Sequence, residues 1–144
     1  MMRLSSETLH ASTVALDGRA VLISGPSGAG KSDLALRLID RGFTLVSDDQ
    51  TIVRKDNHRL LASAPPTIHG KLEIRGVGIV EMETVSDVPV ALFVELTGDI
   101  LRLPDDSRER LVLGVKLPLI NVDALTASAP SKVAVALDRL GLKS

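Results

Sequence analysis

Short apolar runs separated by polar pairs and glycines dominate the first half of the chain, a pattern typical of strands joined by tight turns. Residues 13–16 and 19–24 flank Asp17-Gly18, a dipeptide that favours a type I′ hairpin turn. The second run is apolar throughout its centre, as expected for a strand covered on both faces. We therefore predict an antiparallel hairpin that ends in a buried strand.

The same pattern predicts further strands over residues 43–46, 51–54, 59–62, 90–96 and 111–122. A polar turn at Asp56-Asn57 is expected to join two of them into a second hairpin. Residues 67–80 contain three glycines and follow a pair of prolines, so we predict an irregular, loop-rich segment there.

Apolar residues at spacings of three and four predict two helices, over 31–41 and 131–140. In the first, Leu34 and Leu38 share a face, whereas Arg37 points outward. A glycine follows each helix, at a position where helices commonly stop.

These elements predict an α/β fold with a mixed sheet. The tight hairpins require antiparallel pairing, so a purely parallel, doubly wound sheet is excluded. With 144 residues, of which 44% are apolar, the chain is expected to form one domain, residues 1–144, around an ordinary core.

Composition narrows the classes of function. The chain has no cysteine, which excludes disulfides, thiolate metal sites and a cysteine nucleophile. Its formal net charge is -1 and it has only two aromatic residues, so we expect no nucleic-acid partner. No apolar run approaches the ~20 residues of a membrane span, and no signal-peptide core is found. We therefore expect a cytoplasmic protein with no membrane partner.

The strongest chemical signal lies between the predicted buried strand and the first helix, where the chain satisfies the phosphate-loop pattern G-x-x-x-x-G-K-[ST]. The loop consists of Gly25, Pro26, Ser27, Gly28, Ala29, Gly30, Lys31 and Ser32. Its glycines let backbone N–H groups point at phosphate oxygens, and the helix directs its positive end to the same place. Lys31 is expected to bridge the outer phosphates, and the Ser32 hydroxyl to hold Mg²⁺. The flanking strand and helix favour this interpretation over a glycine-rich turn with a stray lysine.

Asp48 and Asp49 follow the strand after the first helix. In P-loop proteins an Asp at such a position commonly reaches Mg²⁺, directly or through water. Adjacent side chains in extended backbone point to opposite sides, so we expect one carboxylate to face the phosphates and the other a polar neighbour or solvent. A turn capped by aspartates is the alternative.

The pattern alone leaves the roles of several other charged residues open. Glu73 and Arg75 alternate with apolar residues and are expected to share a face, either beside the nucleotide or on a solvated edge strand. Arg102, Arg108 and Arg110 are expected in a polar connection, where such residues are usually solvated. An arginine directed at the phosphates is the sharper alternative.

Together these motifs resemble the catalytic domain of the HPr kinase/phosphorylase family, over nearly the whole chain. Residues 72–80, Leu-Glu-Ile-Arg-Gly-Val-Gly-Ile-Val, are similar to the family signature, which is more specific than a phosphate loop. Asp48 and Asp49 match the paired aspartates of the family, and His10 stands at the expected distance before the phosphate loop. Arg110 resembles the family's catalytic arginine.

The resemblance implies that Asp49 accepts the proton of a seryl hydroxyl that attacks ATP. In the reverse direction Asp49 returns a proton while inorganic phosphate attacks phosphoserine to form pyrophosphate. The further implied roles are Mg²⁺ binding by Ser32, Asp48 and Glu73, phosphate binding by Lys31, and catalytic support by His10, Arg75 and Arg110. The resemblance also implies a fold like that of phosphoenolpyruvate carboxykinase, HPr as the protein partner, and a homo-oligomer, with a hexamer suggested.

Departures from the family pattern modify these expectations. We expect a short form without the N-terminal domain of longer members. Residues 130–133 resemble the start of the segment associated with dephosphorylation, but Ala134-Val135-Ala136 stands where the family has Gly-Arg-Asn. We therefore expect phosphorolysis to be weaker than kinase activity.

Three functions remain open at this point. The first is Mg- and ATP-dependent phosphorylation of a serine in HPr, with reverse phosphorolysis of phosphoserine-HPr. The second is a small-metabolite kinase that uses the same site. The third is a nucleotide-sensing regulator without turnover.

Overall fold

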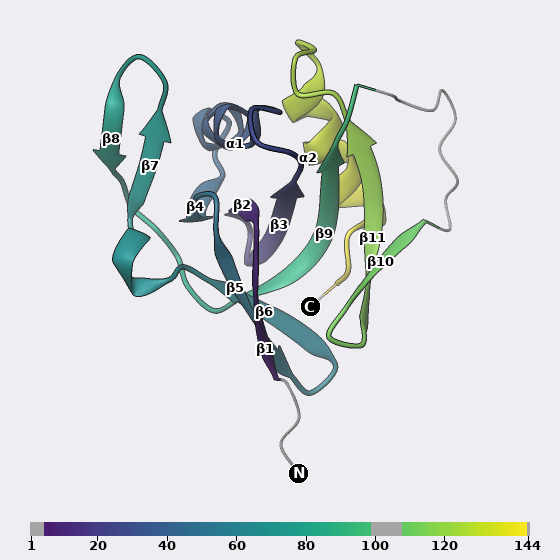
Figure 1. The fold of residues 1–144 in the computed structure, drawn as a ribbon. Helices are drawn as coiled ribbons and strands as arrows, with labels where there is room; N and C mark the ends of the chain where they lie inside the picture. Colours follow the sequence, from purple (N-terminus) through teal and green to yellow (C-terminus); the bar gives the residue numbers. More distant parts are fainter. Residues whose placement is uncertain (1–4, 99–107, 144) are drawn as a thin grey trace.

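The computed structural model describes residues 5–98 and 108–143 (Figure 1). In chain order, their elements are β1 (Ser6–Leu9), β2 (Ala11–Leu16), β3 (Arg19–Ser24), α1 (Lys31–Asp40), β4 (Thr44–Ser47), β5 (Thr51–Asp56), β6 (Arg59–Ser63), the 3-10 turn η1 (Pro66–Ile68), β7 (Lys71–Ile74), β8 (Gly78–Glu81), β9 (Val88–Leu96), β10 (Glu109–Val112), β11 (Val115–Val122) and α2 (Ala129–Leu140). Neither of the α-helices described here has the length and apolar character needed to span a bilayer.

The strands form a curled mixed sheet, which confirms the predicted fold class. Its order is β1-β5-β6-β9-β3-β2-β4, and the β10–β11 hairpin joins β9 through β11. The contacts of β9 with β3 and β11 are parallel, whereas the hairpin contacts are antiparallel. Asp17 and Gly18 join β2 to β3 with φ of 52° and 76°, as the predicted type I′ turn requires.

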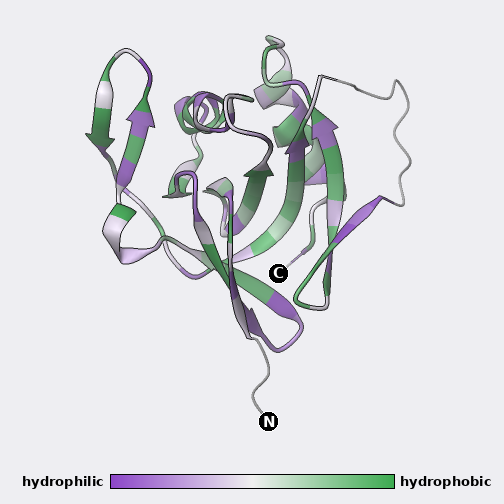
Figure 2. Ribbon diagram, in the orientation of Figure 1, coloured by the Kyte–Doolittle hydropathy of each residue, from purple (hydrophilic) through white to green (hydrophobic). Residues whose placement is uncertain are grey.

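Two hydrophobic clusters lie on the two faces of the sheet, because successive side chains of a strand point to opposite sides. Val21 and Ile23 of β3 belong to the cluster that contains the apolar faces of α1 and α2. Ala20 and Leu22 belong to the other cluster, which is built from strands and includes residues of β5, β6, β10 and β11. The helices thus cover one face and the curled sheet covers the other, with β3 and β9 apolar over most of their length (Figure 2).

Helix α1 ends where the sequence predicts. Gly42 adopts a φ of 105°, its N–H donates to the carbonyl of Ile39 at 3.0 Å, and the N–H of Phe43 donates to the carbonyl of Leu38 at 3.1 Å. This is a Schellman motif, in which a left-handed residue closes the helix and its neighbour packs back on the last turn. Phe43 and Leu38 are both buried in the helix-side cluster.

Several elements bring polar residues to one edge of the sheet. The parallel strands β3, β9 and β11 all end there, and β4 runs in the same direction because β2 is antiparallel to both β3 and β4. The phosphate loop follows β3, and Asp48 and Asp49 follow β4. His10 precedes β2, whose first residue pairs with the last residue of β3. Ligand sites of α/β proteins commonly lie at the carboxyl ends of parallel strands.

The prediction of an irregular segment over residues 67–80 was wrong. β7 and β8 form a separate two-stranded hairpin in which Ile74 pairs with Gly78, so Arg75 and its two successors make the loop. Both strands are short and largely exposed, so the alternation of apolar and polar residues that would predict strands is weak. The three glycines, which favour a loop, therefore dominated the prediction. Arg75 therefore lies in the hairpin loop rather than on a strand face with Glu73.

Three smaller expectations also change. Asn57 and His58 form the turn between β5 and β6, one residue later than predicted. Arg110 lies on β10 rather than in a connection, and Arg102 lies outside the described residues. Arg37 does not point freely outward, because its guanidinium donates to two backbone carbonyls of the turn after β11.

Candidate active site

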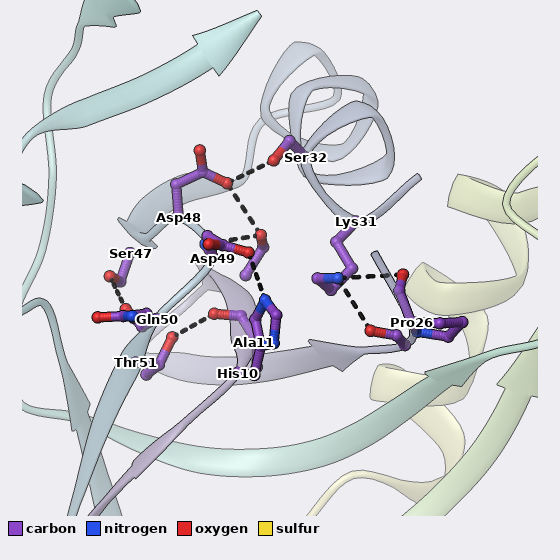
Figure 3. A network of polar contacts seen from close by, with 12 residues as sticks. His10, Ala11, Pro26, Lys31, Ser32, Ser47, Asp48, Asp49, Gln50 and Thr51 are labelled. Carbon is purple, nitrogen blue, oxygen red and sulfur yellow. Dashed lines mark hydrogen bonds and ion pairs between the residues drawn. The ribbon is translucent and has the colours of Figure 1, made fainter. Parts of the chain in front are cut away.

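The phosphate loop adopts a conformation that its glycines make accessible. Gly28 and Gly30 have φ of 82° and 99°, in the left-handed region that side chains disfavour. A Cβ on Gly25 would lie 3.0 Å from the Cβ of Leu96, so a larger residue would force the loop from the sheet. The ammonium of Lys31 is folded over the loop and donates to the carbonyls of Gly25 at 2.9 Å and Pro26 at 3.3 Å (Figure 3).

Asp48 connects three separate parts of the chain. Its Oδ1 accepts hydrogen bonds from the hydroxyls of Ser32 at 2.6 Å and Ser12 at 2.9 Å, and its Oδ2 accepts the N–H of Glu73 at 3.1 Å. Only 8% of the residue is exposed. A buried carboxylate is costly unless donors surround it, and these three donors supply that stabilisation. The contact with Ser32 fixes Asp48 against the first turn of α1.

Asp49, the adjacent residue, lies in a different environment. Its side chain is 60% exposed and its Oδ1 lies 2.7 Å from Nε2 of His10 (Figure 3). Its φ of 66° is left-handed, a conformation that Asp tolerates better than most residues. The N–H of Asp49 donates to the Ser12 hydroxyl at 3.0 Å, which anchors the turn at Asp49 to β2. The two neighbouring carboxylates thus point into different surroundings, as expected.

Most of the predicted site residues line one open cleft of about 900 Å³. From the sequence-based set these are Ser27, Gly28, Gly30, Lys31, Ser32, Asp48, Asp49, Glu73 and Arg75. The β7–β8 hairpin supplies one wall, and Leu125 in the turn after β11 also contributes. The cleft therefore brings phosphate-binding groups, three carboxylates and an arginine together.

His10 and Arg110 line a second, smaller hollow of about 280 Å³. There the Arg110 guanidinium lies 3.0 Å from the Glu95 carboxylate and 4.7 Å from the ring centre of Phe93. His10 contacts Asp49, which lines the larger cleft, so the His10–Asp49 pair stands between the two hollows. Arg110 does not line the cleft that holds the phosphate loop.

Sequence reasoning missed Ser12 and Glu95. Ser12 is fully buried in β2, and its hydroxyl joins Asp48 to the backbone of Asp49. The sequence signal that could have identified Ser12 is its position as a polar residue in a strand that is otherwise largely apolar. Glu95 of β9 pairs with Ser24, the last residue of β3 before the phosphate loop. The sequence does not show that Glu95 lies near the loop, because this depends on the parallel pairing of β3 with β9.

The polar groups in the cleft fit a magnesium ion shared with phosphates. In the part of the chain that the structure describes, no three His, Asp or Glu side chains are grouped to enclose a metal. In phosphate-loop sites, however, Mg²⁺ takes most of its ligands from phosphate and water, with one hydroxyl and one carboxylate from the protein. Ser32 and Asp48, which are hydrogen-bonded to each other, provide this hydroxyl and this carboxylate. The exposed side chain of Glu73 lines the same cleft.

Comparisons with known proteins agree with this architecture. A family model described as "HPr Serine kinase C-terminal domain" matches residues 3–137. An HPr kinase/phosphorylase from Clostridium tetani is 35% identical over 124 residues, covering 85% of this chain and 41% of the relative. One from Lacticaseibacillus casei is 34% identical over 135 residues, covering 88% and 41%. The chain thus spans about two-fifths of the length of these curated relatives.

A solved structure supports the match across the fold. The Hpr(Ser) kinase/phosphatase from Coxiella burnetii superposes with a TM-score of 0.78 at 30% identity. The superposition covers 92% of this chain and 94% of that one.

Proposed function

This chain belongs to the HPr serine kinase C-terminal domain family, and from that premise we propose that it transfers the γ-phosphoryl group of ATP to a serine of the phosphocarrier HPr. The family implies nucleotide-dependent phosphoryl transfer. The observation that carries the proposal is one cleft in which the exposed carboxylate of Asp49 stands beside a complete phosphate loop. This arrangement offers a phosphoryl donor site and a proton acceptor within the same space.

The phosphate loop would hold the donor. Backbone N–H groups of the loop and the N-terminal end of α1 attract the phosphates, and Lys31 adds a full positive charge. In the described conformation Lys31 already lies over the loop, bonded to the carbonyls of Gly25 and Pro26. A bound phosphate would offer its ammonium a charged acceptor in place of these neutral ones.

The ion that accompanies the phosphates would be held by Ser32 and Asp48, with Glu73 close by. When bound, Mg²⁺ neutralises charge on the β- and γ-phosphates. Asp48 is suited to its part because the Ser12 hydroxyl and the Glu73 N–H fix the carboxylate in place.

Asp49 would act on the acceptor. The serine oxygen forms a bond to the γ-phosphorus as the bond to the β–γ bridging oxygen breaks, and ADP leaves with that oxygen. The serine proton passes to the Asp49 carboxylate, which is exposed and therefore accessible to a protein substrate. His10 would orient the Asp49 side chain through their 2.7 Å contact. Arg75, in the loop of the β7–β8 hairpin, would bring positive charge to the phosphoryl group.

The reverse reaction would use the same groups. Inorganic phosphate attacks the phosphorus of phosphoserine, pyrophosphate forms, and Asp49 returns the proton to the serine oxygen. We propose that this direction is the slower one, because the sequence departs from the family pattern at residues 134–136. Those residues lie in α2, and Ser131 near its start accepts a hydrogen bond from Arg41 at 2.8 Å.

One experiment tests the activity and its direction. The purified chain is incubated with HPr, ATP and Mg²⁺, and then with phosphoserine-HPr and inorganic phosphate. We expect phosphoserine to form in the first mixture faster than pyrophosphate forms in the second. Phosphorylation of a small metabolite but not of HPr would favour a metabolite kinase, and ATP binding without transfer to any acceptor would favour a nucleotide-sensing regulator. Equal rates in both directions would show that the change at residues 134–136 is harmless.

We further propose that residues 1–144 act as one catalytic domain, in the cytoplasm, within a homo-oligomer. The family resemblance supports the catalytic domain and the homo-oligomer, and the absence of a predicted membrane span or signal-peptide core in the sequence supports the compartment. Light scattering of the purified chain would test the assembly, and a hexamer is the expected form.

A further inference from the structure

The most exposed large apolar side chains of the described residues all line the cleft that contains the phosphate loop. They are Leu125, Val77 and Ile79, which are 90%, 73% and 71% exposed. Single exposed apolar residues are common on protein surfaces, but several around one cavity are typical of a ligand site. Phosphates gain nothing from such groups, so these side chains serve other parts of the ligands. Val77 and Ile79 belong to the β7–β8 hairpin, whereas Leu125 lies in the turn after β11, on a separate wall of the cleft.

Leu125 is held at its position by an ordered turn. Its N–H donates to the Asp123 carboxylate at 2.9 Å, and Arg37 donates to the carbonyls of Ala124 at 2.6 Å and Thr126 at 2.7 Å. The turn is therefore fixed from both sides of Leu125, and the side chain is exposed because the backbone directs it outward. A backbone turn that is already fixed loses little conformational entropy when a ligand covers it.

The turn lies beside the phosphate loop, on the side away from the carboxylates. Two residues of the loop and the first turn of α1 have different neighbours. Ser32 meets Asp48, whereas a Cβ on Gly30 would lie 3.1 Å from the Cβ of Ala124, the neighbour of Leu125. In Figure 1 the turn after β11 and the β7–β8 hairpin rise on either side of α1.

The direction of phosphoryl transfer then decides which part of the ligand meets Leu125. In transfer from a nucleotide, the attacking and leaving oxygens lie roughly in line on opposite sides of the phosphorus. Asp49 marks the acceptor side of the cleft, so the nucleoside diphosphate leaves towards the opposite side. Ala124 and Leu125 line the same cleft, and Ala124 lies against Gly30 of the phosphate loop rather than against the carboxylates, so we assign the nucleoside to their side.

We propose that Leu125 forms the apolar wall against which the nucleobase of the phosphoryl donor packs. This inference rests on the proposed function and assigns a contact for the nucleoside, which no phosphate-loop residue supplies. A nucleobase has two flat faces of low polarity, and covering one of them with a leucine removes apolar surface from water.

Titration calorimetry of the full chain with Mg-ATP and with Mg-pyrophosphate tests the proposal, because pyrophosphate occupies a phosphate loop but has no base. We expect Leu125→Ser to weaken ATP binding about five- to tenfold, as expected for the loss of a partial apolar contact, and to leave pyrophosphate binding unchanged. The matched control is Leu140→Ser, at a 45% exposed position at the end of α2 that does not line the cleft, and it should change neither affinity. Leu125→Met, which retains an apolar side chain, should restore most of the ATP affinity.

Three outcomes would overturn the assignment. Equal weakening of ATP and pyrophosphate would mean that the substitution disturbs the phosphate loop through Ala124. Unchanged ATP binding would exclude a base contact, and a raised KM for HPr in the same variant would place Leu125 on the acceptor side. A wild-type chain that binds neither ATP nor pyrophosphate would refute the proposed function itself, and this inference with it.

Discussion

Two sides of one cleft differ sharply in how the protein holds them. On the nucleotide side, Asp48 is buried and accepts three hydrogen bonds from distant segments. On the acceptor side, Asp49 is mostly exposed and its side chain contacts only His10 among the described residues. The buried group is fixed before any ligand arrives, whereas the exposed one can exchange its partner for a substrate hydroxyl. Adjacent residues of one type therefore suit different tasks, and burial rather than residue type separates them.

The largest expected effect is on the acceptor side. Asp49→Asn keeps the size of the side chain and removes its capacity to accept a proton, so we expect single-turnover transfer to HPr to fall roughly 10²- to 10⁴-fold. ATP affinity should stay close to that of the wild type, because the carboxylate lies outside the hydrogen bonds of the phosphate loop.

Asp48→Asn is the matched comparison, and its loss of transfer should be milder. If Asp49→Asn reacts at nearly the wild-type rate while Asp48→Asn is inactive, the base has been assigned to the wrong carboxylate. Phosphorolysis, where it is measurable, should fall together with transfer in the Asp49 variant, because the same group returns the proton.

The next largest effect concerns the nucleotide side. Lys31→Ala removes a charged donor from the phosphates, and such hydrogen bonds contribute about 1.5–3 kcal/mol, so binding of ATP and of pyrophosphate should weaken together by about 10- to 100-fold. Calorimetry of both ligands measures this effect. Lys116→Ala, at an exposed position of β11 outside the cleft, is the control and should bind both normally. Full affinity for both ligands in the Lys31 variant would refute the phosphate-loop assignment.

The features of the fold and of the cleft that depend on a short stretch of chain could be predicted from the sequence. The phosphate loop, the type I′ hairpin and the Schellman end of α1 depend on short stretches of chain, so local signals were sufficient. The sequence predicts different surroundings for Asp48 and Asp49, but its premise of extended backbone is wrong, because Asp49 has a left-handed φ of 66°.

Contacts between distant segments could not be read from the sequence. The sequence pattern predicts a polar connection at Arg110, but this residue is on β10 and pairs with Glu95 of β9. Helical spacing predicts that Arg37 points outward, but the turn after β11 places two carbonyls within its reach. Both errors have one cause: the order of strands in the sheet decides which segments meet, and spacing along the chain carries no information on it.

The contrast between the carboxylates predicts a difference in stability. Asp48→Ala leaves the buried hydroxyl of Ser12 and the N–H of Glu73 without their acceptor, and each unsatisfied buried donor is costly. We expect the free energy of unfolding, measured by denaturant titration, to fall by about 1–3 kcal/mol. Asp49→Asn should change it by less than about 0.5 kcal/mol, because the position is exposed and Asn also tolerates the left-handed φ of 66°. Similar losses in both variants would contradict the view that only Asp48 is a structural support of the cleft.

The smallest effect expected is the coupling between His10 and Asp49, and a double-mutant cycle isolates it. Both side chains are more than half exposed, so water competes for their 2.7 Å contact and the stability coupling should be about 0.2–0.5 kcal/mol. The Ser12–Asp48 pair has a similar hydrogen-bond length, 2.9 Å, but is buried, and its coupling should reach about 1 kcal/mol or more. The distances in the two pairs are similar, whereas the pairs differ in burial and in the partner of the carboxylate, an imidazole in one and a hydroxyl in the other. Couplings of equal size would mean that the His10–Asp49 pair is shielded from water, and Asp49 would then be less available to a substrate hydroxyl than its exposure indicates.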